Sequence, residues 1–116
     1  MGQATDRWAE LSAAMEQHDV EAFKDVYAAQ AVFLEPQNAP HETNLLIQAY
    51  LNSWLSPREE VAITTDRTLE SVDGRTLSVE WKISYTAGGR RWKDLPRATW
   101  FELDDDGRIN YQRDYY

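Results

Sequence analysis

The chain contains no cysteine and is short of basic residues. Among its 116 residues there are no Cys, 4 Pro and 5 Gly. Without thiols the protein can form no disulfide, no thiolate nucleophile and no cysteine-rich zinc site. Cysteine content therefore does not decide the compartment, and we take the cytoplasm as the default expectation.

Charge and hydropathy argue against two classes of partner. Lys and Arg number 12 against 20 Asp and Glu, which gives a formal net charge of -8. Nucleic acids and anionic membranes are polyanions, so we expect this chain to bind neither. The N-terminus lacks the basic and apolar regions of a signal peptide, and the apolar runs are only a few residues long. We therefore predict neither a signal peptide nor a membrane span.

Three amphipathic helices are predicted in the first half of a single domain, residues 1–116. Apolar residues recur at helical spacing over residues 5–18, and Asp19 is placed to cap a second short helix. A short strand is expected over residues 31–34. A third helix is expected to begin near residues 41–43 and to end at Pro57.

The second half of the chain alternates apolar and polar residues, which is the period of β-strands. Strands are predicted over residues 61–70, 75–86, 90–103 and 108–116, with glycine-containing turns between them. Helices followed by antiparallel strands indicate an α+β fold, in which a curved, cone-shaped sheet packs against three N-terminal helices.

Two short motifs carry a resemblance to a known family. Glu35-Pro36 closes the first strand, and Arg108-Ile109 is followed by Arg113-Asp114-Tyr115-Tyr116 at the end of the chain. Together with the order of elements, they resemble the SnoaL-like branch of the nuclear transport factor 2-like superfamily, which has a cystatin-like fold. That superfamily includes ketosteroid isomerases, polyketide cyclases and limonene epoxide hydrolases, as well as binding modules without catalytic activity.

The resemblance implies roles for particular residues. The isomerase base is a carboxylate before proline, the place of Glu35, but the two oxyanion-hole positions fall on Leu11 and Thr99. Asp114 matches an aspartate that epoxide hydrolases and SnoaL-type cyclases use in acid/base chemistry. The Arg-x-Asp pair of the hydrolases falls on Glu80 and Lys82, where the charges are swapped.

Alternation along the strands predicts which side chains share the interior face. If Asp114 faces the interior, so should Asn110, and the same face should carry four catalytic candidates: Asp114, Glu35, Glu80 and Lys82. The expected substrate-binding residues are Tyr50, Trp54, Arg97, Thr99, Phe101, Gln112 and Tyr116. Aromatic walls would raise the pKa of Asp114 toward neutrality, and a nearby cation would lower it again or stabilise an enolate or alkoxide.

Each of these residues also has a structural interpretation. Asp114 could neutralise Lys82 or Arg97 as a buried ion pair, and Glu35 could be a solvated loop residue. Glu80 and Lys82 could form an ion pair on an exposed strand face. His18 and His41 are too far from any matching cluster of ligands to suggest a metal ion, so we expect no metal site and no cofactor.

The opposite face of the predicted sheet suggests a homodimer. It is expected to carry seven apolar residues, Leu77, Val79, Trp81, Ile83, Tyr85, Ala98 and Trp100. Soluble monomers rarely expose so large an apolar patch, so we expect this outer sheet face to pack against a second copy.

Two functions remain open at this point. One is cofactor-independent acid/base catalysis on a small hydrophobic molecule, as an isomerase, cyclase, dehydratase or epoxide hydrolase that uses carboxylates in the pocket. The other is a module without catalytic activity that binds a small hydrophobic ligand or only dimerises. Unpaired carboxylates that converge on one cavity would favour the first.

Overall fold

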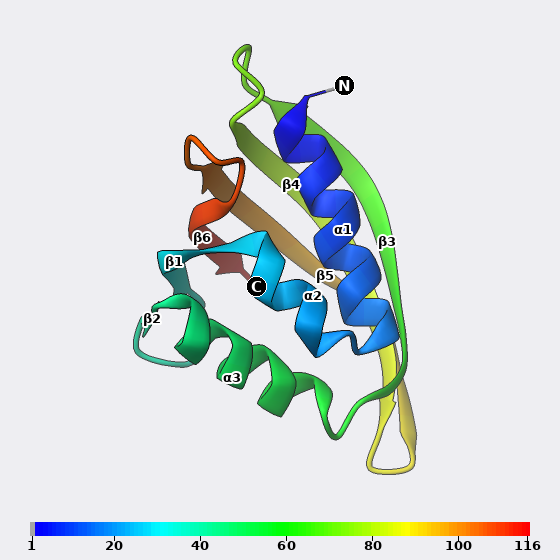
Figure 1. Cartoon of the computed structure of the whole chain (residues 1–116). Helices are drawn as coiled ribbons and strands as arrows, with labels where there is room; N and C mark the ends of the chain where they lie inside the picture. The colour runs from blue at the N-terminus through cyan, green and yellow to red at the C-terminus, as the bar shows by residue number, and fades with distance from the viewer. Residues whose placement is uncertain (1) are drawn as a thin grey trace.

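Three helices cover one face of a curved, six-stranded sheet in the computed structural model, which describes residues 2–116 (Figure 1). The helices are α1 (Gln3–Gln17), α2 (Val20–Val26) and α3 (Asn44–Leu55). The strands are β1 (Tyr27–Leu34), β2 (His41–Glu42), β3 (Glu59–Glu70), β4 (Thr76–Ala87), β5 (Arg90–Leu103) and β6 (Ile109–Tyr115). The predicted α+β fold is confirmed.

The strand order is β2-β1-β6-β5-β4-β3. Strands β3 to β6 form antiparallel neighbours, whereas β1 pairs with β6 in parallel. The parallel pair brings the end of the first strand beside the end of the last one, with Leu34 opposite Arg113. The sequence did not predict β2. It also did not predict the first four residues of β1, a strand that begins directly after α2.

Local sequence explains where the helices begin. The Asp19 side chain accepts a hydrogen bond from the Ala22 amide, as predicted, and Thr43 caps α3 by accepting one from Leu46. Among residues 2–116, no helix is both long and apolar enough to cross a membrane.

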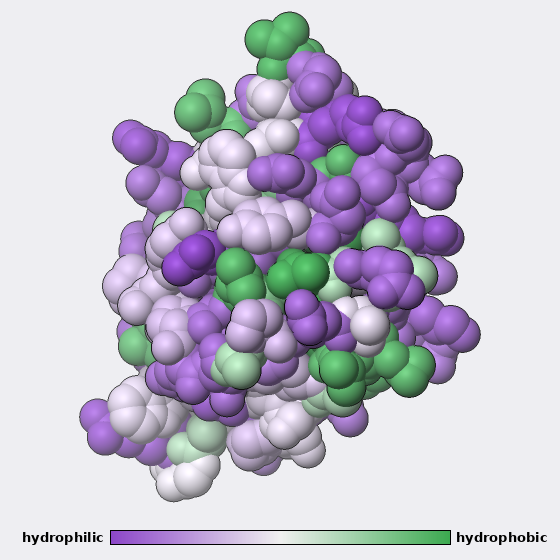
Figure 2. All heavy atoms as spheres, turned by 90° about the vertical axis from the view of Figure 1, so that its left-hand side faces the viewer, coloured by the Kyte–Doolittle hydropathy of each residue, from purple (hydrophilic) through white to green (hydrophobic). Residues whose placement is uncertain are grey.

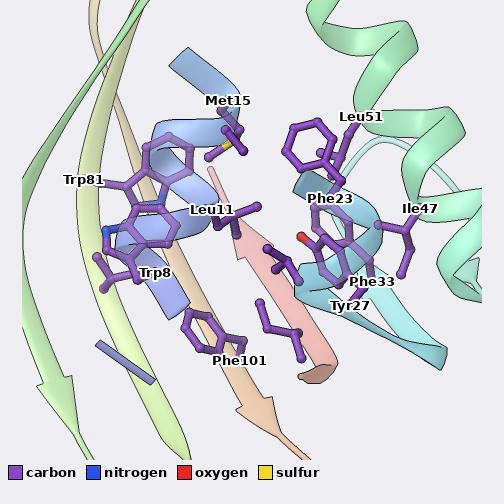
Figure 3. Close-up of a cluster of buried hydrophobic side chains, with 14 of the residues drawn as sticks. Trp8, Leu11, Met15, Phe23, Tyr27, Phe33, Ile47, Leu51, Trp81 and Phe101 are labelled. Atoms are coloured by element: carbon purple, nitrogen blue, oxygen red, sulfur yellow. The ribbon is translucent and has the colours of Figure 1, made fainter. Parts of the chain in front are cut away.

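The core lies between the helices and the concave face of the sheet (Figure 3). Trp8 of α1 packs against Trp81 of β4 with ring centroids 5.2 Å apart, and Leu11 and Met15 lie beside them. Phe33 and residues of α2 and α3 fill the other side of the same core. Burial of these large apolar side chains is the main force that holds the helices on the sheet.

The predicted faces of β4 are wrong, because a bulge in β5 shifts the pairing by one residue. Between the pairs Tyr85–Trp92 and Ile83–Leu95 the register changes, and Asp94 there has a φ of 54°. A one-residue shift moves a whole strand to the other face relative to its neighbour. Five residues predicted to lie outside, Leu77, Val79, Trp81, Ile83 and Tyr85, are therefore buried under the helices.

A second shift removes Asn110 from the interior. The pairing of β5 with β6 changes between Glu102 and Leu103, so Ile109 and Gln112 are both buried, whereas Asn110 is exposed.

On the side formed by β1, β2 and β6, hydrophobic residues are interspersed among hydrophilic ones (Figure 2).

Candidate functional site

Asp114 lies on the concave face of β6, directly opposite Thr99 of β5. Thr99 Oγ1 donates a hydrogen bond of 2.8 Å to Asp114 Oδ1, and Gln112 Nε2 donates one of 3.1 Å to the same oxygen. Both donors come from strands, which hold their side chains rigidly. Among residues 2–116 no hydrogen bond is found to Oδ2, so this oxygen remains available.

Two further residues fix the direction of these hydrogen bonds. Trp81 Nε1, which can only donate, donates to Thr99 Oγ1 at 2.9 Å. The Thr99 hydroxyl proton therefore points at Asp114. The Tyr27 hydroxyl donates to Gln112 Oε1 at 2.7 Å, and this contact turns the Gln112 amide nitrogen toward Asp114. The network thus presents only donors to Oδ1.

Burial raises the pKa of Asp114 to about 6. The hydrogen bonds from Gln112 and Thr99 and the positive charge of Arg97 lower this pKa, whereas the negative charge of Glu35 raises it. Burial outweighs the stabilising contacts, so a substantial fraction of Asp114 is protonated at pH 6 and the group can gain or lose a proton near neutrality.

Glu35 has a different environment at the end of β1. Its side chain is 1% exposed, so the interpretation as a solvated loop residue is wrong. It accepts hydrogen bonds from the Gln37 amide (2.8 Å), Asn38 Nδ2 (2.6 Å) and His41 Nε2 (2.7 Å), and from the Tyr116 hydroxyl at 3.4 Å. Burial works to raise its pKa, but the contacts with His41, Gln37 and Asn38 outweigh burial and lower it.

His41 is the functional neighbour that sequence analysis missed. Its ring stacks on Tyr50 with centroids 4.1 Å apart while its Nε2 contacts Glu35. Strand β2 places His41 opposite Phe33, because the loop between β1 and β2 reverses the chain. The signal in the sequence was the pair of prolines, Pro36 and Pro40, which bounds a tight return.

A small cavity lies beside Asp114 between the helices and the sheet. Its walls are formed by Met15, Phe33, Tyr50, Leu51, Trp54, Trp81, Ile83, Arg97, Asp114 and Tyr116. Its volume is about 40 Å³, which is room for water rather than for a substrate. A larger ligand enters only if a wall moves, and Tyr116, 48% exposed, is the most exposed lining residue.

Arg97 and Tyr116 stand together at the edge of this cavity. The Arg97 guanidinium carbon lies 3.6 Å from the centroid of the Tyr116 ring, a cation–π contact. No ion pair joins Arg97 or Lys82 to Asp114 within residues 2–116, so the interpretation of Asp114 as half of a buried ion pair is wrong.

The structure separates the other predicted site residues into three groups. Tyr50, Trp54, Arg97 and Tyr116 line the cavity, and Thr99 and Gln112 hold Asp114. Phe101 is fully buried in the core and does not line the cavity.

Glu80 and Lys82 lie on the outer face of the sheet, so their predicted place beside Asp114 is wrong. Glu80 pairs with Arg67 at 3.4 Å, and Lys82 pairs with Asp66 at 3.2 Å. Their side chains are 58% and 43% exposed. The physical reason is the bulge in β5, which turns Trp81 inward and its two neighbours outward. Within residues 2–116, no three His, Asp or Glu side chains are grouped to hold a metal ion.

Solved structures of several proteins have the same fold. RV0760c from Mycobacterium tuberculosis is 14% identical with a TM-score of 0.88, over 100% of this chain and 92% of that one. It has also been crystallised with estradiol-17beta-hemisuccinate. A steroid delta-isomerase from Pseudomonas aeruginosa is 27% identical with a TM-score of 0.71, over 98% of this chain and 79% of that one.

An LEH-like epoxide hydrolase from M. tuberculosis is 18% identical with a TM-score of 0.82, over 97% of this chain and 81% of that one. No curated protein matches the chain by sequence. The sequence profile of the SnoaL-like domain matches residues 7–112, which is nearly the whole chain. Because that match covers well over half of the chain, the chain belongs to the SnoaL-like domain family.

Proposed function

We propose that the protein catalyses a cofactor-independent acid/base reaction on a small hydrophobic molecule, with Asp114 as the group that transfers the proton. The observation that supports this most strongly is the asymmetry of the Asp114 carboxyl. Oδ1 is held by Thr99 and Gln112, whereas Oδ2 accepts no hydrogen bond from residues 2–116. A positioned acid with one free oxygen and a pKa of about 6 suits proton transfer near neutral pH.

Glu35 acts in this proposal through its charge. Its donors keep it ionised, and its negative charge raises the pKa of Asp114. Two carboxylates whose environments move their pKa values in opposite directions are a recurring arrangement in acid/base sites. Glu35 is thus the electrostatic partner of Asp114, and the proton moves at Asp114.

The substrate class follows from the walls and from the relatives. Apolar side chains make up most of the cavity lining, which favours a hydrophobic ligand. The structurally similar proteins include a steroid isomerase and an epoxide hydrolase. Conjugated enones, epoxides and β-keto esters are therefore the compounds to screen. In enones and β-keto esters Asp114 would take a proton from one carbon and return it to another atom, and in epoxides it would protonate the ring oxygen while water adds to the ring carbon.

The test is the variant Asp114→Asn, assayed on any compound that the wild type converts. Asparagine keeps an acceptor for Thr99 and Gln112 but cannot exchange a proton, so turnover should fall by about 10² to 10⁴-fold. Asp66→Asn, which removes a carboxylate from a surface ion pair with Lys82, is the matched control and should retain turnover. Turnover by Asp114→Asn at the wild-type rate would rule the proposal out.

The second candidate function is ligand binding without catalysis. The observation that favours it is the hydrogen bonding of Glu35, whose two oxygens are occupied by Gln37, Asn38 and His41, so that only Asp114 is left with a free carboxyl oxygen. In that case the wild type binds enones or epoxides without converting them, and Asp114→Asn binds them equally well.

A homodimer stays a prediction, but fewer exposed apolar residues support it than the sequence suggested. Most of the apolar row that suggested it is buried under the helices. Trp100, 40% exposed, remains on the outer face, where Ser78 separates it from Leu69, 76% exposed. The ion pairs Arg67–Glu80 and Asp66–Lys82 lie on the same outer face, and a two-fold dimer would place this face against its own copy. Light scattering at micromolar concentration tests this, and a monomeric mass contradicts it. The cytoplasmic location also stays a prediction.

A further inference from the structure

Arg97 is a cation without an acidic partner at the edge of the cavity. It lies opposite Trp81 on the concave face and lines the cavity together with Asp114. Arg67 and Lys82, two exposed cations of the sheet, each have a carboxylate within 4 Å. Other sheet cations without one in residues 2–116, such as Arg113, are exposed to solvent, whereas Arg97 is partly buried. Among residues 2–116, Arg97 has none. A partly buried guanidinium without a carboxylate partner costs solvation energy, which a bound anion would offset.

The contact with Tyr116 decides which part of Arg97 is free. The ring occupies a face of the guanidinium, with the central carbon 3.6 Å from the ring centroid. The N–H groups of a guanidinium lie in its plane and point outward from its edge. Arg97 is therefore held in place by its face while its edge can donate two parallel hydrogen bonds.

The other lining residues have few hydrogen-bond donors for a polar group of a ligand. Met15, Leu51, Trp54 and Ile83 are apolar or aromatic, and the Trp81 indole N–H is already donated to Thr99. The charged groups of the cavity are thus one acid and one cation that are not joined to each other. Such a wall fits a molecule with an apolar body and one acidic group.

We propose that Arg97 binds a carboxylate group of the ligand, so that the cavity accepts a small apolar carboxylate. This inference rests on the proposed function, because the same molecule then lies beside Asp114. A planar carboxylate matches the two parallel donors of a guanidinium edge, and charge-assisted bonds of this kind are about twice as strong as neutral ones. Because the cavity is only about 40 Å³, a wall must move before the apolar body can pack against Trp54 and Ile83. Asp114 in its protonated form does not repel the bound anion.

The experiment compares binding of matched carboxylates and carboxamides. Phenylacetate with phenylacetamide, and 4-phenylbutyrate with 4-phenylbutyramide, have the same shape but differ in charge. Binding is followed at pH 6 by calorimetry and by the fluorescence of Trp54 and Trp81, which line the cavity. The wild type should bind at least one carboxylate about tenfold more tightly than its amide.

Three variants test whether Arg97 causes the preference for carboxylates over carboxamides. Arg97→Gln should abolish it without weakening the amide, and Arg97→Lys, which keeps the charge but not the paired donors, should retain part of it. Arg113→Gln, on the exposed face of the neighbouring strand, is the matched control and should keep it in full. Thermal melting verifies that each variant is folded.

Two results overturn the inference: no carboxylate preference in the wild type across both pairs, absence of binding included, or an unchanged preference in Arg97→Gln. Because binding is measured at equilibrium without turnover, these results are independent of the Asp114→Asn assay. An absent carboxylate preference would reject only the role of Arg97, whereas turnover by Asp114→Asn at the wild-type rate would reject the catalytic role of Asp114.

Discussion

Glu35 and Asp114 are two carboxyl groups, one buried and one half-buried, with pKa shifts of opposite direction. Glu35 lies in a return loop where donors reach both of its oxygens, and its pKa is lowered. Asp114 lies between two strands where the donors reach one oxygen only, and its pKa is raised to about 6. Burial opposes ionisation at both sites, so the number and placement of donors decide which group stays charged.

The difference follows from the backbone around each group. A loop can turn its own amides and short polar side chains toward a carboxylate, as Gln37 and Asn38 do for Glu35. In a strand the backbone amides form hydrogen bonds to the neighbouring strands, so the hydrogen bonds to Asp114 come from the side chains of Thr99 and Gln112. In this protein the loop therefore favours the charged form of Glu35, whereas the sheet favours the protonated form of Asp114.

The largest expected change in stability comes from Glu35→Gln. The amide introduces a donor where three donors already converge, so one buried contact becomes repulsive. We expect a loss of about 2 to 4 kcal/mol in the free energy of unfolding at pH 7, measured by urea denaturation. Glu80→Gln, which removes one partner of an exposed ion pair, is the control and should cost less than about 1 kcal/mol. Equal losses would contradict the contrast between buried and exposed carboxylates.

Asp114→Asn should change stability in the opposite direction. The folded state binds the Asp114 proton more tightly than the unfolded chain, where the pKa is near 3.8, so stability falls as pH rises from about 4 through about 6. A neutral asparagine removes this loss and should stabilise the protein by about 1 to 3 kcal/mol at pH 8 but not at pH 3.

Glu35 gives the reverse dependence. Its folded pKa is below its ordinary value of 4.5, so its contribution to stability is present above pH 4.5 and is lost as pH falls through the lowered pKa. The advantage of the wild type over Glu35→Gln should therefore shrink in acid. Urea denaturation of the wild type and both variants between pH 3 and pH 8 measures the two slopes, and parallel slopes would contradict the assignment.

Thr99→Val sharpens the comparison by removing one of the two donors to Asp114. The Trp81 indole N–H also loses its acceptor, so we expect a loss of about 1 to 2 kcal/mol in stability. Without the Thr99 hydroxyl the pKa of Asp114 should rise further. Thr64→Val, at an exposed position of β3 opposite Lys82, is the control, and an unchanged Asp114 pKa in Thr99→Val would contradict the role of this donor.

Tyr116→Phe should have the smallest effect. The hydroxyl lies 3.4 Å from Glu35, at the outer limit of a hydrogen bond, and the ring still stacks on Arg97 in the variant. We expect a change below about 0.5 kcal/mol in thermal or urea denaturation. A loss as large as that of Glu35→Gln would mean that Tyr116, rather than the loop, holds the charge of Glu35.

The sequence predicted the order of helices and strands well, because helical and strand periods are local properties. It also placed Asp114, Thr99 and Gln112 on one face, since these residues alternate along β5 and β6. The face of β4 could not be predicted, because it depends on a bulge at Asp94 whose positive φ leaves no clear mark in the sequence. The extra residue in β5 places Trp81 in the interior, and it leaves Glu80 and Lys82 on the outer face.

His41 was missed for a related reason. Its contact with Glu35 depends on a two-residue strand and on the path of a loop, and neither has a periodic pattern. Long-range contacts that consist of a single side chain, such as the hydrogen bond from Tyr27 to Gln112, carry no signal in one sequence. Such contacts nevertheless set the direction of every hydrogen bond to Asp114.

The most direct test is a titration of the side-chain carboxyl carbons by NMR in the wild-type protein, with Asp114→Asn used to assign the Asp114 signal. We expect Asp114 to titrate with a pKa of about 6 and Glu35, in the same spectra, to titrate below 4.5. An Asp114 signal that titrates near 3.8, together with Glu35 at its ordinary value, would contradict the claim that these two environments separate a proton-transfer group from a fixed charge.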